Sequence, residues 1–320
     1  GPNRVGIPFT NIKLLGLGQP LADGLKSFLK EDFTPGHVKR IYYWMAPAVS
    51  MTPSFIVFAV IPFGSMLGIQ KMVIADLNVG ILFTFGIVSL SVYGIVLAGY
   101  SANSKYPFLG GIRASAQMIS YEIAMGMSVV PVFMLAADPA WQSELSVEWK
   151  TYLDGAGLLN LSSVIAYQSD SIFSWMVFKQ PIAFCIFLIA IFAETNRLPF
   201  DLPESETELV SGYNTEYSSM KFALFFMGEY AAMISVSALM VPLFFGGWTL
   251  PFFGLNETAT TLAGGILQIL VFLGKIACFM VLFVWIRWMV PRFRYDQLMD
   301  LGWKRFLPLA LANIIITAII

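Results

Sequence analysis

The chain has 320 residues, of which 57% are hydrophobic and only 12% are charged, and its mean hydropathy is +0.72. Soluble domains average about 45–50% apolar and about 25% charged residues, so this composition excludes a disordered chain, a coiled coil and an ordinary soluble enzyme. It indicates an integral membrane protein, and the formal net charge of −1 excludes the basic field that binding nucleic acid requires.

Residues 20–30 carry an amphipathic pattern near the start of the chain. Large apolar residues recur there at helical spacing, with polar residues opposite, at Leu21, Leu25, Phe28 and Leu29. A proline at the start of the segment suits the first turn of a helix. The pattern predicts a short helix lying in the membrane interface, and a plain surface anchor is an equally good interpretation.

Seven apolar runs follow, and a helix needs roughly 20 apolar residues to cross a bilayer. The candidate spans are residues 45–64, 77–99, 115–137, 174–193, 222–246, 263–288 and 306–320. Several contain prolines, which membrane helices tolerate where neighbours satisfy the freed backbone groups. We therefore predict an all-α integral membrane protein. It is a single membrane domain over residues 1–320, with a bundle of about seven transmembrane helices and one interfacial amphipathic helix.

The two ends of the chain predict a fragment. The sequence begins at Gly1 with neither Met nor a signal peptide. The last apolar run ends at Ile320 and is too short to cross a membrane comfortably. We expect the chain to be truncated at both ends.

Basic residues collect on one side of the predicted bundle. Fifteen of the 19 Lys and Arg residues lie in four segments that alternate with the spans: residues 1–44, 100–114, 194–221 and 287–305. The excess of Lys and Arg on cytoplasmic segments predicts that these four face the cytoplasm. The acidic segment 138–173 is then expected to face outward as a loop.

Cysteine and histidine are too few for a metal centre. Cys185 and Cys278 both lie inside apolar runs, and His37 is the only histidine. No Cys-x-x-Cys pair, dinucleotide-binding glycine motif or phosphate loop occurs in the sequence. We expect any nucleotide or redox metal to be bound by a partner.

Three ionisable residues lie inside predicted spans, where charge is costly and a functional role is the default hypothesis. They are Glu122, Glu229 and Lys275, and Glu194 closes a further span. Glu122 and Glu229 each lie seven residues into a span, roughly 10 Å below the cytoplasmic surface at 1.5 Å per residue. With Glu194, they place three carboxylates in the cytoplasmic half of three different helices, and such an arrangement suits a proton relay. The alternative is that Ser, Tyr or backbone groups hydrogen-bond each one and it has no role. We expect Glu122 and Glu229 to face protein and not lipid.

The segment 194–221 is acidic on the side where positive charge normally collects. Its six carboxylates outnumber Arg197 and Lys221 to give a net charge of −4; they are Glu194, Asp201, Glu204, Glu206, Glu208 and Glu216. Such a cluster suits proton uptake, or coupling to a charge change nearby. A solvated acidic loop is the usual interpretation of a charge run, but the apolar residues among these acids favour a packed loop.

The motif PRFRYDQLM begins at residue 291 and places Arg292 and Arg294 on either side of Phe293. A positive-inside membrane anchor explains the composition equally well. Because guanidinium groups suit carboxylates, we expect both arginines to pair with carboxylates of the 194–221 segment.

Several long motifs resemble one family. AETNRLPFDLPESETELVSGYNTEYSSMKFALFFMGEY and PRFRYDQLM are similar to membrane subunit 1, also called the H subunit, of respiratory complex I, the proton-pumping NADH:quinone oxidoreductase. GPNRVG, QPLADGLK, YSANSKYPFLGGIRASAQMISYE and the W-K-x-x-L-P segment at 303–308 agree as well. The resemblance covers essentially the whole chain except 138–173. The family has one more helix before GPN, so we expect this chain to lack it.

The resemblance implies a hinge subunit that forms the membrane side of a quinone tunnel and holds no catalytic redox centre. Motif by motif, it assigns to the tunnel surroundings Arg4, Gln19, Asp23, Phe225, Arg292 and Arg294. It assigns to a coupling loop Asp201, Glu204, Glu206 and Glu208. It assigns to a proton path Glu122, Glu194, Glu216 and Glu229.

The same resemblance implies what the chain works with. Quinone is the substrate, and FMN, NADH and the iron–sulfur clusters are on partner subunits. The partners are the other membrane subunits and the peripheral-arm subunits of the quinone site, in a bacterial inner membrane.

Two other functions compete with this one. The membrane subunit of an energy-converting hydrogenase is the alternative, but the PFDLPESETE and TEY runs weigh against it. A proton-coupled transporter would favour inverted repeats around a midplane site. No repeat is found here, and the carboxylates lie toward one face.

Overall fold

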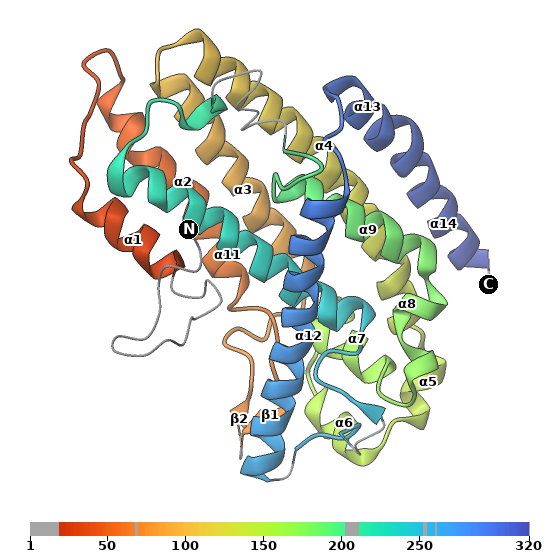
Figure 1. Cartoon of the computed structure of the whole chain (residues 1–320). Coiled ribbons are helices and arrows are strands. Elements are labelled where there is room, and N and C mark those ends of the chain that lie inside the picture. The colour runs from red at the N-terminus through yellow and green to blue at the C-terminus, as the bar shows by residue number, and fades with distance from the viewer. Residues whose placement is uncertain (1–18, 68–69, 202–210, 252–254, 260, 320) are drawn as a thin grey trace.

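The computed structural model of the chain describes residues 19–67, 70–201, 211–251, 255–259 and 261–319. It is almost entirely helical, apart from an antiparallel hairpin of β1 (Met66–Leu67) and β2 (Gln70–Lys71) (Figure 1). The all-α prediction is confirmed. Among the described residues, five helices are long and apolar enough to cross a membrane.

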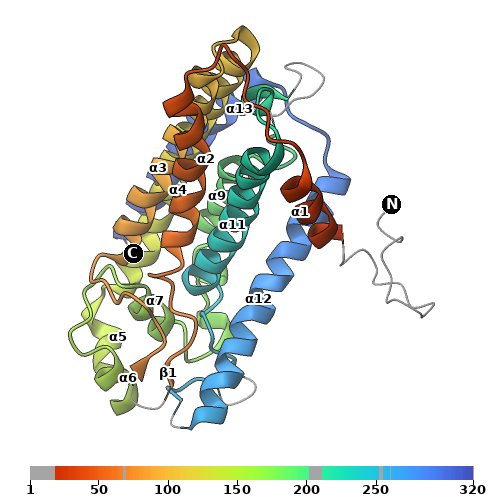
Figure 2. The ribbon, with the colours of Figure 1, turned by 90° about the vertical axis from the view of Figure 1, so that its left-hand side faces the viewer.

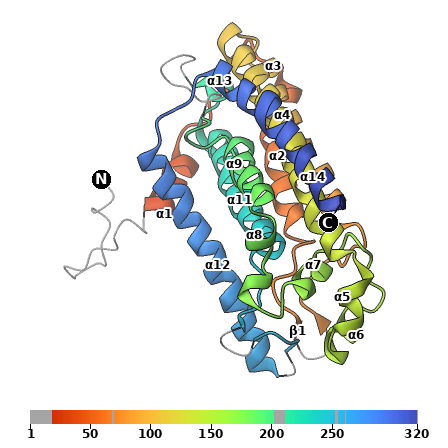
Figure 3. The ribbon, with the colours of Figure 1, turned by 90° about the vertical axis from the view of Figure 1, so that its right-hand side faces the viewer.

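The long helices form three layers (Figures 2 and 3). One layer holds α2 (Arg40–Val57), α3 (Gly80–Ser101), α4 (Lys105–Ala136) and α14 (Leu307–Ile319). The middle layer holds α9 (Pro181–Glu194) and α11 (Ser219–Phe244), and α12 (Leu262–Met289) lies alone on the far side. The middle layer is thus enclosed by protein on both sides, which is where polar side chains can find partners.

The predicted amphipathic helix is confirmed as α1 (Gln19–Leu29). Its described apolar side chains face outward, with Phe28 72% and Leu29 80% exposed. The hydroxyl of Ser219, at the start of α11, donates to the carbonyl oxygens of Ser27 and Lys30 at 3.1 and 2.9 Å. The helix is therefore fixed to the bundle while its apolar face stays available to a membrane interface.

Four predicted spans have clearly different boundaries in the structure. The third begins at Lys105 and not at residue 115, so most of the predicted segment 100–114 is helical and Glu122 lies near the middle of α4, not near its start. The first helix ends at Val57 and not at residue 64, so Pro62 lies beyond it. The fourth is divided into α8 (Met176–Lys179) and α9, because Pro181 starts a new helix and cannot continue the old one.

The last predicted span was too short. α13 (Tyr295–Asp300) continues through a π-helical turn, Leu301–Phe306, into α14, and the combined helix Tyr295–Ile319 has 25 residues. The segment between the last two membrane helices is therefore residues 290–294, much shorter than the predicted 287–305. Polar residues at 300–305 hid this continuation in the sequence.

The outward segment 138–173 was predicted as a loop, and this was wrong. It folds into α5 (Pro139–Glu144), α6 (Val147–Tyr152) and α7 (Leu161–Tyr167). The side-chain oxygens of Asp138, Ser146 and Asn160 cap the three helices. Trp149 and Tyr152 are buried in the main core against Trp248, so the segment is an integral layer of the fold. Two short 3₁₀ turns, Ile172–Ser174 and Gly212–Asn214, complete the described elements.

A polar cluster joins the hairpin to this outward segment. The Asp76 carboxylate pairs with Lys71 at 2.9 Å and accepts from the Asn160 amide at 2.6 Å. The Asn78 side chain accepts from the Gly157 backbone at 3.1 Å. Burial by itself raises the pKa of Asp76, but the hydrogen bonds from Lys71 and Asn160 and the Lys71 charge hold it below its ordinary value.

The close approach of α2 and α3 depends on Gly94. A Cβ atom there would lie 2.5 Å from the backbone nitrogen of Ser50. We expect Gly94→Ala to destabilise the protein by about 1–3 kcal/mol, because the helices must separate to accept the methyl group. Thermal unfolding of the purified protein measures this. Gly86→Ala on the same helix is the control, since nothing lies within 4 Å of that position. Equal melting temperatures for the two variants would contradict the account.

The lowered pKa of Asp76 predicts an acid-sensitive attachment of the outward segment. The ionised carboxylate stabilises the folded state above its unfolded pKa of about 3.9, and this contribution is lost as pH falls through the lower folded value. Protection of the Gly157 amide against hydrogen exchange, corrected for intrinsic rate, should fall below about pH 4. Asp76→Asn should show weak protection with no step at any pH, while the exposed Asp154→Asn should match wild type. Identical profiles for wild type and Asp76→Asn would refute this.

Candidate functional site

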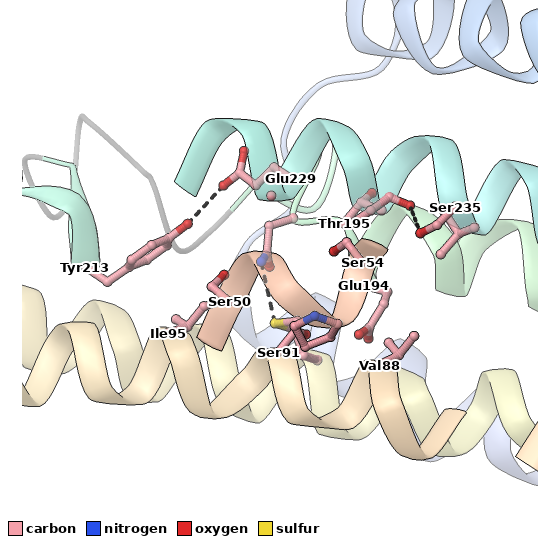
Figure 4. Close-up of a pocket in the computed structure, with 16 residues that line it drawn as sticks. Ser50, Ser54, Val88, Ser91, Ile95, Glu194, Thr195, Tyr213, Glu229 and Ser235 are labelled. Atoms are coloured by element: carbon pink, nitrogen blue, oxygen red, sulfur yellow. Dashed lines mark hydrogen bonds between the residues drawn. The ribbon is translucent and has the colours of Figure 1, made fainter. Parts of the chain in front are cut away.

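A small cavity lies where α2, α3, α4, α9 and α11 meet (Figure 4). Its volume is about 40 Å³, which is room for about three water molecules. Most of its lining surface is apolar, but six residues with hydroxyl side chains are among those that line it: Ser50, Ser54, Ser91, Thr195, Tyr213 and Ser235. Two of the carboxylates singled out in the sequence, Glu194 and Glu229, line it as well.

Glu194 is the last residue of α9 and is only 5% exposed. Neither of its carboxylate oxygens has a hydrogen-bond partner in the described part of the protein. An unpartnered carboxyl group in an apolar interior is costly unless it holds a proton or hydrogen-bonds to water. The cavity, with its hydroxyl-bearing residues, is the one environment with polar groups that Figure 4 shows beside it.

Glu229 enters the same cavity from α11 and is held by two groups. Tyr213 donates its hydroxyl hydrogen to Oε1 at 2.9 Å, and the Arg197 guanidinium lies 3.3 Å from Oε2. Both members of the ion pair are nearly buried, with 12% of the arginine and 11% of the glutamate side chain exposed. Arg197 also lies over the ring of Tyr230, 4.5 Å from its centroid.

Glu122 lies on α4 and is not among the residues that line the cavity. Its carboxylate hydrogen-bonds with the hydroxyl of Ser89 on α3, and its charge interacts with that of Glu194. The prediction that Glu122 and Glu229 face protein is confirmed, because each contacts a side chain of a neighbouring element.

Glu216, assigned to the same path by resemblance, is not in the cavity. Its carboxylate is 23% exposed and lies 3.7 Å from the His37 ring. Its backbone carbonyl accepts the hydroxyl of Tyr43, whose ring stacks on Tyr217 at 4.3 Å. Glu216 thus lies at the surface beside this aromatic pair.

The residues assigned to the tunnel surroundings are in different environments. Phe225 is 1% exposed and packs edge-to-face against Tyr213 and Tyr217 at 5.4 and 4.9 Å. Asp23 lies on the exposed surface of α1. Arg4 and the side chain of Gln19 lie outside the described residues.

Among the described residues of the acidic segment, a carboxylate partner is seen for only one of the two arginines. Arg292 contacts the Asp201 carboxylate at 3.1 Å, as predicted. Arg294 instead pairs with Asp296 at 3.0 Å, and both side chains are largely exposed, so the prediction for Arg294 was wrong. The backbone turns between the two residues: the amide of Phe293 donates to the carbonyl of Pro199 at 3.2 Å, and Arg294 starts α13.

Glu204, Glu206 and Glu208 lie outside the described residues, but both ends of their segment are packed. At one end Phe200 is 3% exposed and stacks on Phe293 at 5.4 Å. At the other end Tyr213 is 1% exposed. Whether the loop between these two ends is packed or solvated stays a prediction.

No sequence pattern pointed to Gln117, which holds the start of this segment. Its fully buried side-chain amide donates to the carbonyls of Ala193 and Phe200, both at 2.8 Å. A mid-helix glutamine is common in many surroundings, and only the fold brings α4 against this turn. The partnership of Tyr213 and Arg197 with Glu229 was likewise invisible, although both lie in the motif-rich segment.

In the part of the chain that the structure describes, no group of three His, Cys, Asp or Glu side chains could hold a metal ion. Cys185 and Cys278 are both free thiols on the exposed surface. The chemistry available in the cavity is therefore that of carboxyl and hydroxyl groups, which can accept and donate protons.

Comparison with known proteins finds one matching family and several similar subunits. The family model for NADH dehydrogenase matches residues 1–318. The H subunit of NADH-quinone oxidoreductase from Protochlamydia amoebophila is 44% identical over 99% of this chain and 86% of its own length. The H 1 subunit from Geobacter sulfurreducens is 46% identical, over 95% of this chain and 82% of its own. Subunit 8 of the Rhodothermus marinus enzyme is also 46% identical, over 100% and 86%.

The unequal pairing of the two arginines predicts unequal effects of their removal. Arg292→Gln should raise hydrogen exchange at the Phe293 amide, because the Asp201 ion pair helps to hold that backbone on Pro199. Arg294→Gln should leave that amide near wild type, since an exposed ion pair contributes little, about 0–1 kcal/mol. Mass spectrometry of peptides covering residues 290–294 measures both. Equal exchange in the two variants would rule out the specific role of Arg292.

Proposed function

The chain belongs to the NADH dehydrogenase family, and we propose that it is the H-type membrane subunit of a proton-translocating NADH:quinone oxidoreductase. The supporting observation is identity of 44–46% with such subunits over 95–100% of the chain. This favours a complex I subunit over a hydrogenase membrane subunit or a proton-coupled transporter. The chain is then part of an enzyme without holding a redox centre, with quinone as the substrate.

The location and partners follow in part from the same relatives. The chain is a multi-pass membrane protein with several apolar helices, and other subunits complete the complex. We infer a bacterial inner membrane from the bacterial relatives. The partners in this proposal are the neighbouring membrane subunits and the peripheral-arm subunits that hold the quinone headgroup. FMN, NADH and the iron–sulfur clusters are then on those peripheral subunits.

The buried carboxylates are proposed as the proton path. The single observation that carries this is Glu194, which lies almost fully buried on a cavity that Glu229 and several serine residues also line. A serine hydroxyl donates one hydrogen and accepts others, so it can pass a proton between two carboxyl groups. In this proposal a proton enters at Glu229, crosses the cavity to Glu194 and continues to Glu122. Glu216 takes up protons at the surface.

The acidic segment is proposed to couple this path to quinone chemistry. Quinone reduction takes up two protons, so the charge beside the quinone changes during turnover. Carboxylates of Asp201, Glu204, Glu206 and Glu208 would respond by binding or releasing protons. Support comes from the burial of Phe200 and Tyr213 on either side of residues 202–210, since buried neighbours can be displaced by a charge change beside them.

The quinone tunnel is proposed to run past the start of this segment. Arg292, on Asp201, is the described residue best placed to line it. Phe225 supports the wall from the aromatic cluster, and Asp23 lies on α1, whose apolar face suits a lipid-side entrance. Arg4, Gln19 and Arg294 keep their assignment by resemblance alone.

Neutralising the carboxylates in the assembled, reconstituted complex tests this function. Glu194→Gln should lower proton translocation per electron, or slow quinone reduction about tenfold, equivalent to about 1.4 kcal/mol of barrier. Glutamine preserves the shape of the side chain but cannot carry a proton. Combined Gln replacement of Glu204, Glu206 and Glu208 should slow quinone reduction or shift its pH profile. Glu148→Gln, on the outward surface, is the control for side-chain replacement.

The alternative is that these residues only support the tunnel wall. If all the assembled Glu→Gln variants show normal turnover, pH profile and proton stoichiometry, the coupling role is rejected and only support of the tunnel wall remains. Loss of quinone reduction with assembly intact supports the proposal.

A further inference from the structure

Lys275 is the charged residue of the membrane bundle that the proposed function does not use. It lies near the middle of α12, and the window of this helix that would cross the membrane has only 17% of its residues buried. A lysine facing lipid at such a position would be costly. The side chain is instead half-buried and turned toward the end of α11.

Three backbone carbonyls receive the Lys275 ammonium. Nζ donates to Phe245 at 2.7 Å, Gly247 at 2.9 Å and Thr249 at 2.8 Å. The Trp175 ring lies on a further side, 4.7 Å from Nζ to its centroid. An ammonium group has three N–H donors, and each has a carbonyl acceptor here. The hydrogen-bonding capacity of Lys275 is therefore met by backbone groups.

The turn that presents these carbonyls depends on two glycines. Gly246 and Gly247 have φ values of +66° and +57°, a region that glycine enters without strain. A Cβ at Gly246 would also lie 2.8 Å from the Trp175 ring nitrogen. The turn is therefore shaped to direct alternate carbonyls, at 245, 247 and 249, toward one point.

Gln168 satisfies the remaining groups at this helix end. Its amide nitrogen donates to the carbonyls of Pro242 and Leu243 at 2.9 and 3.2 Å, and its oxygen accepts from the Gly246 amide at 3.1 Å. The last carbonyls of a helix lack partners within the helix and carry its partial negative charge. Gln168 thus caps the last carbonyls of α11, and Lys275 binds α12 to the turn that follows the helix.

α12 has few other attachments. Its buried residues form one narrow stripe: Gly265, Gln268, Phe272, Ile276, Phe279 and Phe283. At the outward end the Gln268 side-chain oxygen accepts from the Ser65 backbone amide at 3.0 Å and from the Ser65 hydroxyl. At the other end Arg292 and Phe293 rest on Asp201, Pro199 and Phe200. Met289 is 14 residues beyond Lys275, about 21 Å along the axis.

We propose that Lys275 is a positioning residue: its ammonium fixes α12 to the turn at residues 245–249, which follows α11, and thereby sets how Arg292 meets Asp201 beyond the other end of α12. A helix held by one narrow stripe can slide or rotate on its neighbour. A charged group held by three carbonyls opposes both movements. The functional consequence rests on the proposed function, in which Asp201 belongs to the coupling segment. The mechanical consequence does not.

Hydrogen exchange on the assembled complex tests the mechanical part. Lys275→Met keeps the length of the side chain and removes the three hydrogen bonds. Exchange should rise about tenfold in peptides covering 245–249 and also in those covering 290–300, from the loss of charge-assisted hydrogen bonds. Lys275→Arg, which keeps the charge, should restore much of the protection at 290–300. Lys179→Met, at an exposed lysine over Tyr167, is the control.

The distant peptide decides the proposal. Raised exchange at 245–249 alone, with 290–300 at wild-type rates, would reduce Lys275 to a local contact with that turn and overturn it. If Lys275→Met fails to assemble, Lys275→Gln, which still donates two hydrogen bonds, is measured in the same way and judged by the same peptides.

Enzyme kinetics then separate this proposal from the proposed function. Lys275→Met should raise the KM for quinone several-fold with a smaller change in kcat. Combining it with Arg292→Gln should add little to the effect of Arg292→Gln alone, because both changes act through one contact. Raised exchange at 290–300 with unchanged quinone kinetics would support the positioning role and count against the quinone assignment of Arg292. If the effects of Lys275→Met and Arg292→Gln on KM are fully additive, the two residues act independently and the proposal is overturned.

Discussion

A polar group in the apolar interior of a membrane bundle must be met by another polar group of the same protein, because lipid tails offer none. Most of the specific contacts in this chain follow from that constraint. Glu229 is met by Tyr213 and Arg197, and Glu122 by Ser89. The carbonyl end of α11 is met by Gln168, and the turn that follows it by Lys275. These contacts place α9 and α11 as the middle layer between two others.

Glu194 differs from these groups, because neither of its carboxylate oxygens has a hydrogen-bond partner among the described residues. Glu122 and Glu229 each have a protein partner, whereas Glu194 lines a cavity together with several hydroxyl-bearing residues. A site built only for stability would have provided a donor, as Tyr213 does for Glu229. A group that takes up and releases a proton needs surroundings that serve both states, and hydroxyl groups do this because they both donate and accept. This makes Glu194 the central residue of the proposed path.

The short segment between α12 and α13 links the inner carboxylates to the acidic segment. Arg292 and Phe293 contact Asp201 and Phe200 near the start of that segment, and the Gln117 amide of α4 donates to the Phe200 carbonyl. Arg197 lies between Glu194 and this turn in the chain and pairs with Glu229. A charge change at the acidic segment thus has a short, packed route to the cavity. This arrangement is what the proposed coupling requires.

The sequence by itself determined the helical membrane class, most of the spans and the amphipathic helix. It also predicted which carboxylates face protein and not lipid. These depend on local hydropathy and periodicity, which each segment carries alone. The acidic residues and the motifs also identified the family. Only the tertiary structure decided which groups meet. Arg292 and Arg294 look alike in the sequence, yet one pairs with Asp201 and the other with Asp296. Lys275 looked like an isolated charge, yet carbonyls from a turn 26 to 30 residues earlier surround it. Such pairings depend on how distant helices pack, and no local pattern records that geometry.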